Sequence, residues 1–170
     1  MERPCKEKYY LNIAREVAQR STCLRVKIGA VIVRDDQIIA TGYAGAPRKT
    51  LDCYERGFCL RNQLNIPHGQ RYELCRSCHA EQNAIINSAR AGVSLLGGDM
   101  YQYAQDKEGK VIDGLPCFIC KKMIINAGLN RMICSNKEGD YKIFNIKDWV
   151  KDWQENDIVD DKNQYGIDQN

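Results

Sequence analysis

Two cysteines of the segment Cys-Phe-Ile-Cys, Cys117 and Cys120, are the first residues whose spacing could support chemistry. They lie three residues apart, and on a helix both thiols would emerge on one face. Pro116 precedes them and is typical of a first helical turn, where the helix dipole favours thiolate over thiol. Thiolate is the form that binds zinc. The pair therefore predicts part of a metal site, although redox motifs and structural zinc knuckles share this spacing.

A third ligand is predicted at His79, which opens the segment His-Ala-Glu. The other histidine, His68, lies in an irregular region and is the weaker candidate. Glu81 follows His79 by two residues, and its carboxylate could carry protons to and from water on the metal. Because positions i and i+2 of a regular helix diverge, we expect His79 at an irregular first turn. Two thiolates and an imidazole balance the charge of zinc and leave a fourth position open, which is the pattern of a catalytic site.

The order of these segments resembles the signature of the cytidine and deoxycytidylate deaminase superfamily. The segment His79-Ala80-Glu81 comes first, and Pro116-Cys117-Phe118-Ile119-Cys120 follows it. The similarity extends from about residue 21 to residue 134 and includes the segments 29–33, 42–48 and 82–85. Within the superfamily the chain looks most like deoxycytidylate deaminases and their bacterial relatives.

The resemblance implies a zinc-dependent hydrolase that converts deoxycytidylate (dCMP) to dUMP and ammonia in nucleotide metabolism. Water would attack C4 of cytosine, while Glu81 protonates N3 and then the departing amine. His79, Cys117 and Cys120 would bind the catalytic Zn²⁺. The resemblance also implies a five-stranded sheet flanked by helices and a homo-oligomer, often a hexamer. In some relatives deoxynucleoside triphosphates regulate activity, so allosteric control is a further expectation.

Contacts to the substrate are expected from the segment after residue 42 and from the motifs themselves. Deoxycytidylate deaminases commonly carry asparagine where this chain has Ala44, so the resemblance does not imply their contact to the sugar. Arg48 and Lys49 are candidates to contact a phosphate, and Arg25 is a weaker one. Within the motifs the candidate substrate contacts are Ala80 and Pro116.

The nine cysteines exceed what packing in a reducing compartment requires, which predicts a second metal. Four thiolates would close a tetrahedral structural zinc site and anchor a loop that is too polar to bury a core. Some deoxycytidylate deaminases hold a second zinc in the corresponding region. The alternatives are Cys78 as the fourth ligand, or free thiols packed in a turn-rich segment. The four candidate ligands are Cys23, Cys53, Cys59 and Cys75.

Hydrophobic periodicity predicts the elements that must position these residues. Helices are expected over 6–20, 79–91, 117–127 and 145–154, with Gly92 and Gly128 ending the second and third. Strands are expected over 27–33, 37–43, 100–103 and 131–134, the first two joined as a hairpin, and residues 44–77 form a long irregular connection. This order predicts a three-layer α/β/α cytidine deaminase-like fold with a mixed sheet of about five strands. We expect one deaminase domain over 1–154 and a mobile polar tail over 155–170.

Composition narrows the choice of partner. The net charge is +3 and no run of lysine and arginine is present, which favours a small nucleotide over a nucleic-acid polymer. Neither a signal-peptide pattern nor a run of about 20 apolar residues occurs, so we expect a cytoplasmic protein with no membrane partner. The alternative functions are deamination of adenosine in transfer RNA, deamination of a riboflavin or pterin intermediate, and a non-catalytic zinc-stabilised binding module. Glu81 and the open metal position argue against the last of these.

Overall fold

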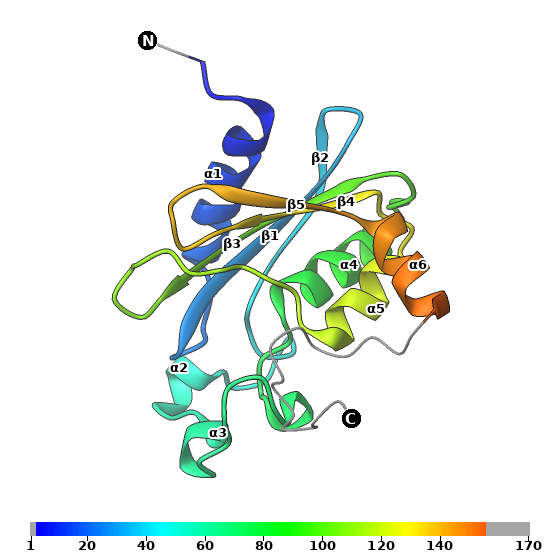
Figure 1. The fold of residues 1–170 in the computed structure, drawn as a ribbon. Coiled ribbons are helices and arrows are strands. Elements are labelled where there is room, and N and C mark those ends of the chain that lie inside the picture. The colour runs from blue at the N-terminus through cyan, green and yellow to red at the C-terminus, as the bar shows by residue number, and fades with distance from the viewer. Residues whose placement is uncertain (1–2, 156–170) are drawn as a thin grey trace.

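The computed structural model describes residues 3–155 and has one mixed sheet at its centre (Figure 1). The strand order is β2-β1-β3-β4-β5. Strands β1, β2 and β3 pair antiparallel, β3 and β4 pair parallel, and β5 runs antiparallel to β4. The strands are β1 (Val26–Arg34), β2 (Gln37–Tyr43), β3 (Asp99–Asp106), β4 (Arg131–Ser135) and β5 (Tyr141–Asn145).

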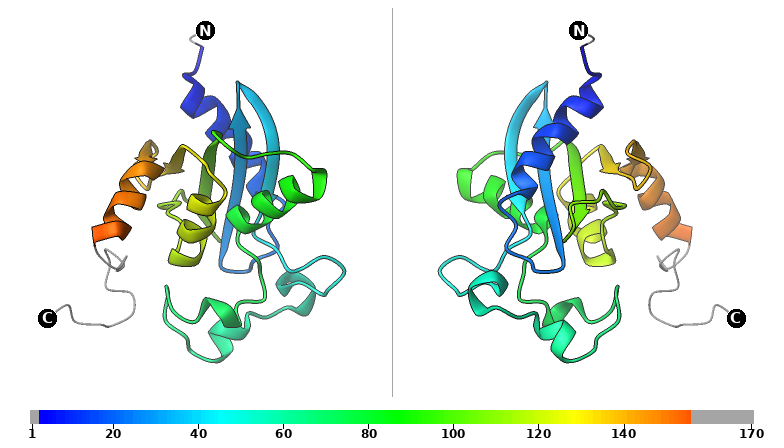
Figure 2. Two further views of the ribbon diagram at one scale, coloured as in Figure 1. Left: turned by 90° about the vertical axis from the view of Figure 1, so that its right-hand side faces the viewer. Right: turned by 90° about the vertical axis from the view of Figure 1, so that its left-hand side faces the viewer.

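Helices cover both faces of this sheet, as the two side views of Figure 2 show. Helix α1 packs on one face, while α4, α5 and α6 lie on the other. The predicted three-layer α/β/α fold with five strands is therefore confirmed. The helices are α1 (Lys6–Ala18), α2 (Cys53–Arg56), α3 (Leu60–Gln63), α4 (Ala80–Ala91), α5 (Phe118–Asn126) and α6 (Ile146–Glu155), with a 3₁₀ turn η1 (Tyr72–Leu74).

Side chains from alternate strand positions form a separate core on each face. On the α1 face, Tyr10 and Leu11 pack against Val31 and Ile133. On the opposite face, the core combines residues of the strands with residues of α4, α5 and α6, including fully buried Ile124. This second core holds in place the two helices that carry the predicted metal ligands.

Two glycines allow helices to lie directly on strands. A Cβ at Gly29 of β1 would overlap the backbone of α1 at Ala14 and Ala18. A Cβ at Gly42 of β2 would likewise overlap the backbone of α4 at Ala84. The backbones of α4 and β2 are therefore in direct contact at Gly42, and this contact fixes the position of the first turn of α4 relative to the sheet.

The β1–β2 hairpin is closed by Asp35 and Asp36, which have φ values of 51° and 62°. Two consecutive left-handed residues form a turn that matches the twist of paired strands, and aspartate tolerates this conformation. The two turn residues and the strand patterns on either side were therefore sufficient to predict this hairpin. The connection 44–77, expected to be irregular, contains α2, α3 and η1, and β5 was not predicted as a strand.

Helix α1 begins near one end of the sheet, and the segment carrying α2 and α3 lies beyond the other (Figure 1). Among residues 3–155, no helix is both long enough and apolar enough to cross a bilayer. The tail expected over 155–170 falls, from residue 156 on, outside the described residues.

Candidate metal centre and active site

The predicted metal ligands sit at the facing N-termini of two helices. His79 caps α4 in an extended conformation (φ −71°, ψ 159°), and its backbone N–H donates to Oε1 of Gln82 at 2.9 Å. Cys117 caps α5 in a similar conformation, and Cys120 follows in the first turn. Because His79 stands before the helix rather than inside it, its side chain and that of Glu81 reach the same place, as the two-residue spacing required.

The three candidate ligand atoms lie close together. Nδ1 of His79 is 3.4 Å from Sγ of Cys117 and 3.4 Å from Sγ of Cys120. Within residues 3–155, these three form the one group of histidine, cysteine or acidic residues whose ligand atoms all lie within 4.8 Å of one another. A soft donor set of two thiols and one imidazole is suited to zinc.

The electrostatics of the two thiols also suit a cation. A hydrogen bond from Cys120, together with His79 nearby, lowers the pKa of the Cys117 thiol to about 4. Donating that hydrogen bond raises the pKa of Cys120, and burial adds to the effect. A cation between the two sulfurs would favour the thiolate form of both.

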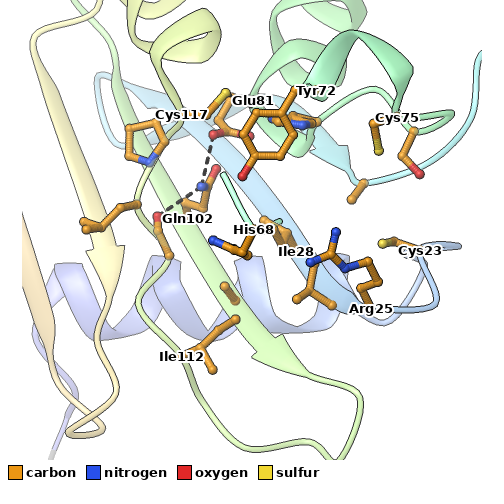
Figure 3. Close-up of a pocket in the computed structure, with 18 of the residues that line it drawn as sticks. Cys23, Arg25, Ile28, His68, Tyr72, Cys75, Glu81, Gln102, Ile112 and Cys117 are labelled. Carbon is orange, nitrogen blue, oxygen red and sulfur yellow. Dashed lines mark hydrogen bonds between the residues drawn. The ribbon is translucent and has the colours of Figure 1, made fainter. Parts of the chain in front are cut away.

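Glu81 is almost completely buried, with 2% of its surface exposed, and it lies in the first turn of α4. Burial raises the pKa of its carboxyl group. A carboxyl group whose pKa is raised towards neutrality can both accept and return a proton. Its neighbour is Gln102 of β3, whose Nε2 donates to Oε1 of Glu81 at 3.2 Å (Figure 3).

The sequence analysis did not identify Gln102. The one feature of the sequence that could have indicated a role for Gln102 is its position as a polar residue between two tyrosines in a predicted strand. Its side chain is 1% exposed, and besides Glu81 its Nε2 also contacts the carbonyl oxygen of Gly114 at 3.0 Å. Both partners are distant in sequence from Gln102, so only the folded chain shows the contact.

A cavity of about 220 Å³ opens beside the metal-ligand cluster, and Figure 3 shows it from the side. Glu81, Gln102 and Cys117 form its inner end, while Cys23 and Cys75 lie at the opposite end. Between the two ends lie the apolar side chains Ile28 and Ile112 together with His68, the weaker of the two histidine candidates (Figure 3). Further apolar residues of the lining are Ala44, Leu115 and Pro116.

The residues proposed to contact substrate are divided by the structure. Arg25, Ala44 and Pro116 all line the cavity. Ala44 offers only a methyl group there, since its backbone N–H and carbonyl are engaged with Ile28 and Thr22. Arg25 is the basic side chain labelled in Figure 3 beside the apolar middle of the cavity.

The other three proposed contacts do not line the cavity. Ala80, the first residue of α4, is fully buried in the core between that helix and the sheet. Arg48 is exposed and donates to Oδ1 of Asn87 at 2.5 Å, and Lys49 is exposed in a left-handed turn. Arg48 and Lys49 were candidates because they follow the segment that begins at residue 42. The contact of Arg48 with Asn87 shows that this part of the chain instead runs along the outer side of α4.

The four cysteines proposed for a second metal all line the cavity. Burial raises the pKa of Cys53, and the nearby thiols of Cys23, Cys59 and Cys75 raise it further. In the described part of the chain, however, no three of these sulfurs meet the 4.8 Å separation found around His79. The alternative ligand, Cys78, pairs through its backbone with Gly45 and does not line the cavity.

A buried arginine orders the wall of the cavity that faces His79, and the sequence analysis did not identify it. Arg61 is 3% exposed and donates to the carbonyl oxygens of Pro67 and Gln70 at 2.9 and 2.6 Å. Its guanidinium lies 4.6 Å from the centre of the Tyr72 ring. The Tyr72 ring in turn meets the His79 ring edge-on, with centroids 4.9 Å apart. The contacts of Arg61 with Tyr72 and of Tyr72 with His79 link the connection 44–77 to a predicted metal ligand.

Comparison with known proteins gives one consistent result. The family described as "Cytidine and deoxycytidylate deaminase zinc-binding region" matches residues 4–136. The deoxycytidylate deaminase of Schizosaccharomyces pombe is 32% identical over 131 residues, which are 77% of this chain and 37% of that protein. The chain therefore spans little more than a third of the length of that relative.

A shorter relative is covered almost completely. The deoxycytidylate deaminase of Mycobacterium phage D29 is 33% identical over 138 residues, covering 78% of this chain and 96% of the phage protein. Among solved structures, the dCMP deaminase of cyanophage S-TIM5 in complex with dCMP and dUMP is similar, with a TM-score of 0.55 and 25% identity. That match covers 78% of this chain and 82% of the cyanophage chain.

Proposed function

Since the chain belongs to the cytidine and deoxycytidylate deaminase zinc-binding family, we propose that it hydrolyses dCMP to dUMP and ammonia. The observation that carries the proposal is the cluster of His79, Cys117 and the fully buried Cys120, with His79, Cys117 and Glu81 lining one cavity. The relatives named above are deoxycytidylate deaminases, and the cyanophage enzyme binds both dCMP and dUMP.

One zinc ion would be held by His79, Cys117 and Cys120. Three protein ligands with an open fourth position are typical of catalytic rather than structural zinc. When bound, zinc supplies a Lewis acid that activates water for attack on a polarised ring carbon.

The chain's own residues would then handle the base and the protons. Glu81 takes a proton from the attacking water and delivers it to N3 of cytosine, then takes the proton of the new hydroxyl group on C4 and delivers it to the departing amine, so that uracil and ammonia result. Its burial excludes bulk water from these transfers. Ile28 and Pro116 provide apolar surface against which a pyrimidine ring can lie.

For the phosphate, we propose Arg25 as the contact, ahead of Arg48 and Lys49. Arg25 lines the cavity between the apolar middle and the outer end, whereas the other two side chains lie outside it. A guanidinium can bind a phosphate through two parallel hydrogen bonds. Ala44 has no polar side-chain atom to offer the sugar, so the phosphate and the base would provide most of the recognition.

We further propose that Cys23, Cys53, Cys59 and Cys75 hold a second, structural zinc ion. Support comes from their shared place along the lining of one cavity, with Cys23 between α1 and β1, Cys53 in α2, Cys59 at the cap of α3 and Cys75 at the end of η1. The four sulfurs must lie closer together than the structure places them to form a tetrahedral site. Short loop shifts of this kind are expected where the metal itself organises the segment.

The remaining proposals concern organisation. We propose one deaminase domain over residues 1–154 that acts as a homo-oligomer, a hexamer by the family resemblance, under allosteric control. The nine cysteines form no disulfide with one another, and we propose a cytoplasmic location. The modest net charge of +3 supports a small nucleotide partner and no nucleic-acid polymer.

The test is deamination of a panel of cytosine compounds by the purified zinc-loaded protein, followed by ultraviolet absorbance. The panel contains deoxycytidine, dCMP, dCTP and CMP, together with adenosine and a pterin as unrelated bases. We expect the highest kcat/KM for dCMP. Turnover of adenosine or the pterin without turnover of any cytosine compound would overturn the proposal.

A further inference from the structure

The amide of Gln102 connects three segments that build the active site. It projects from β3, and its Nε2 reaches Glu81 of α4 at 3.2 Å and the carbonyl oxygen of Gly114 at 3.0 Å. Gly114 stands three residues before Cys117, in the segment that leads into α5. One side chain thus links the sheet, the helix that carries Glu81 and the approach to two metal ligands (Figure 3).

The chemistry of an amide fixes the roles of these atoms. Nε2 has two hydrogens and both of its partners are acceptors, so the –NH₂ group, rather than the carbonyl, must face Glu81. Oε1 of Glu81 is thereby held as an acceptor. The other oxygen, Oε2, is left as the one that can carry a proton without breaking this contact.

The position of Gly114 makes the anchor rigid. Its backbone N–H donates to the carbonyl oxygen of Ser135 at 2.9 Å. A Cβ at Gly114 would lie 3.1 Å from Oγ of Ser135 and 3.2 Å from the carbonyl oxygen of Gln102, so the segment runs against β3 and β4 with no room for a side chain. The carbonyl oxygen that Gln102 uses as its second partner therefore has little freedom to move.

The second polar atom of the amide is also informative. Oε1 of Gln102 is buried, and no donor from the described residues reaches it. Gln102 lines the cavity, and an unpaired buried acceptor is unfavourable unless a ligand or a bound water donates to it.

We propose that Gln102 is a positioning residue, which holds Oε1 of Glu81 so that Oε2 carries the proton transferred during deamination. The inference rests on the proposed function for the reaction itself, but the contact it describes belongs to the protein alone. A buried amide anchored on Gly114 keeps the carboxylate in one rotamer before substrate enters, and misplacement of a catalytic group by about 1 Å is enough to lower a rate by roughly 100-fold.

The test compares Gln102→Met with Gln105→Met. Methionine matches the length of glutamine but cannot donate, and Gln105 is another buried glutamine of β3 (9% exposed) that does not line the cavity. For Gln102→Met we expect kcat to fall about 10- to 100-fold, with KM changed by less than about threefold and zinc content unchanged. The Gln105→Met control should keep the wild-type kcat.

A crystal structure of the zinc-loaded Gln102→Met protein supplies a readout that does not depend on turnover. We expect the Glu81 carboxylate to occupy more than one conformer there and a single conformer in the wild type. A single wild-type-like conformer, or a kcat within about twofold of wild type, would overturn the proposal. An equal loss in Gln105→Met would also overturn it, because the effect would then be one of strand packing.

Two further outcomes are separable. If Gln102→Met does not fold, Gln102→Glu keeps the shape but cannot donate to both partners, and a wild-type kcat in that variant overturns the proposal. If the wild-type protein deaminates no compound of the panel, the proposed function fails, whereas the crystallographic comparison still decides the role of Gln102.

Discussion

Replacement of Glu81 by glutamine is the most direct perturbation of the proposed mechanism. The two side chains have the same shape, and the amide oxygen of the variant can still accept the hydrogen bond from Gln102. The –NH₂ group then takes the place of Oε2 and cannot carry a proton between water and the base. General acid–base catalysis contributes about 10²- to 10⁴-fold to the rate. We therefore expect kcat to fall by at least that factor, which corresponds to a rise of ~3 to 5 kcal/mol in the activation free energy.

The thermal stability of Glu81→Gln should be equal to that of the wild type or higher. Burial raises the folded-state pKa of Glu81 above its unfolded value, so the charged form costs stability once the pH exceeds the unfolded pKa. The neutral amide carries no such cost at neutral pH. We therefore expect Glu81→Gln to unfold at the wild-type temperature or above it, when zinc has been removed from both proteins before the measurement.

Three measurements on the same preparation decide the matter. They are dCMP turnover by ultraviolet absorbance, zinc per chain by metal analysis, and the midpoint of thermal unfolding. Turnover close to wild type would refute the role of Glu81 as the proton carrier. Loss of zinc from the variant would refute a different step, since it would make Glu81 a metal ligand rather than a proton carrier.

Other expectations follow from the cavity, the cysteines and the close packing of α4. Arg25→Gln should lower kcat/KM for dCMP about 10- to 100-fold, because hydrogen bonds to charged groups contribute ~1.5–3 kcal/mol, and should leave the value for deoxycytidine unchanged. If Arg48→Gln lowers the dCMP value instead, the phosphate lies outside the cavity. Wild-type protein should contain two zinc ions per chain by metal analysis and Cys53→Ser one, with faster proteolysis of the loop; a wild-type content of one would exclude the structural site. Gly42→Ala should lower the free energy of unfolding by about 1–3 kcal/mol or more in a denaturant titration, because the new Cβ meets the α4 backbone at Ala84, and an unchanged value would contradict that packing.

Local patterns in the sequence were enough for the elements whose signals lie within a few residues. The helix ends at Gly92 and Gly128, and the two-residue turn at Asp35 and Asp36, depend on backbone preferences that each residue brings with it. Spacing was enough to nominate His79 with Glu81, and the structure places the two beside one cavity. Such features are readable because the interacting groups are neighbours along the chain.

Elements with weak local signals were not predicted. Strand β5 is only partly buried and lacks a clear alternation, and it forms by pairing with β4, as the antiparallel register of Tyr141 with Ser135 shows. Helices α2 and α3 have four residues each, too few for a hydrophobic period to be visible. Helix α2 begins with a capping box between Asp52 and Glu55, and Arg61 of α3 donates to the carbonyl oxygens of Pro67 and Gln70.

The sequence by itself determined which residue types could bind zinc and move protons, because ligand identity and spacing are properties of the chain. The tertiary structure decided which side chains surround that chemistry. It brought Gln102 to Glu81 across 21 residues of sequence, and it placed Arg25 in the cavity while directing Arg48 away from it. The physical reason is that burial and hydrogen-bond partnership depend on the packing of segments far apart in the chain, and no local period records that packing.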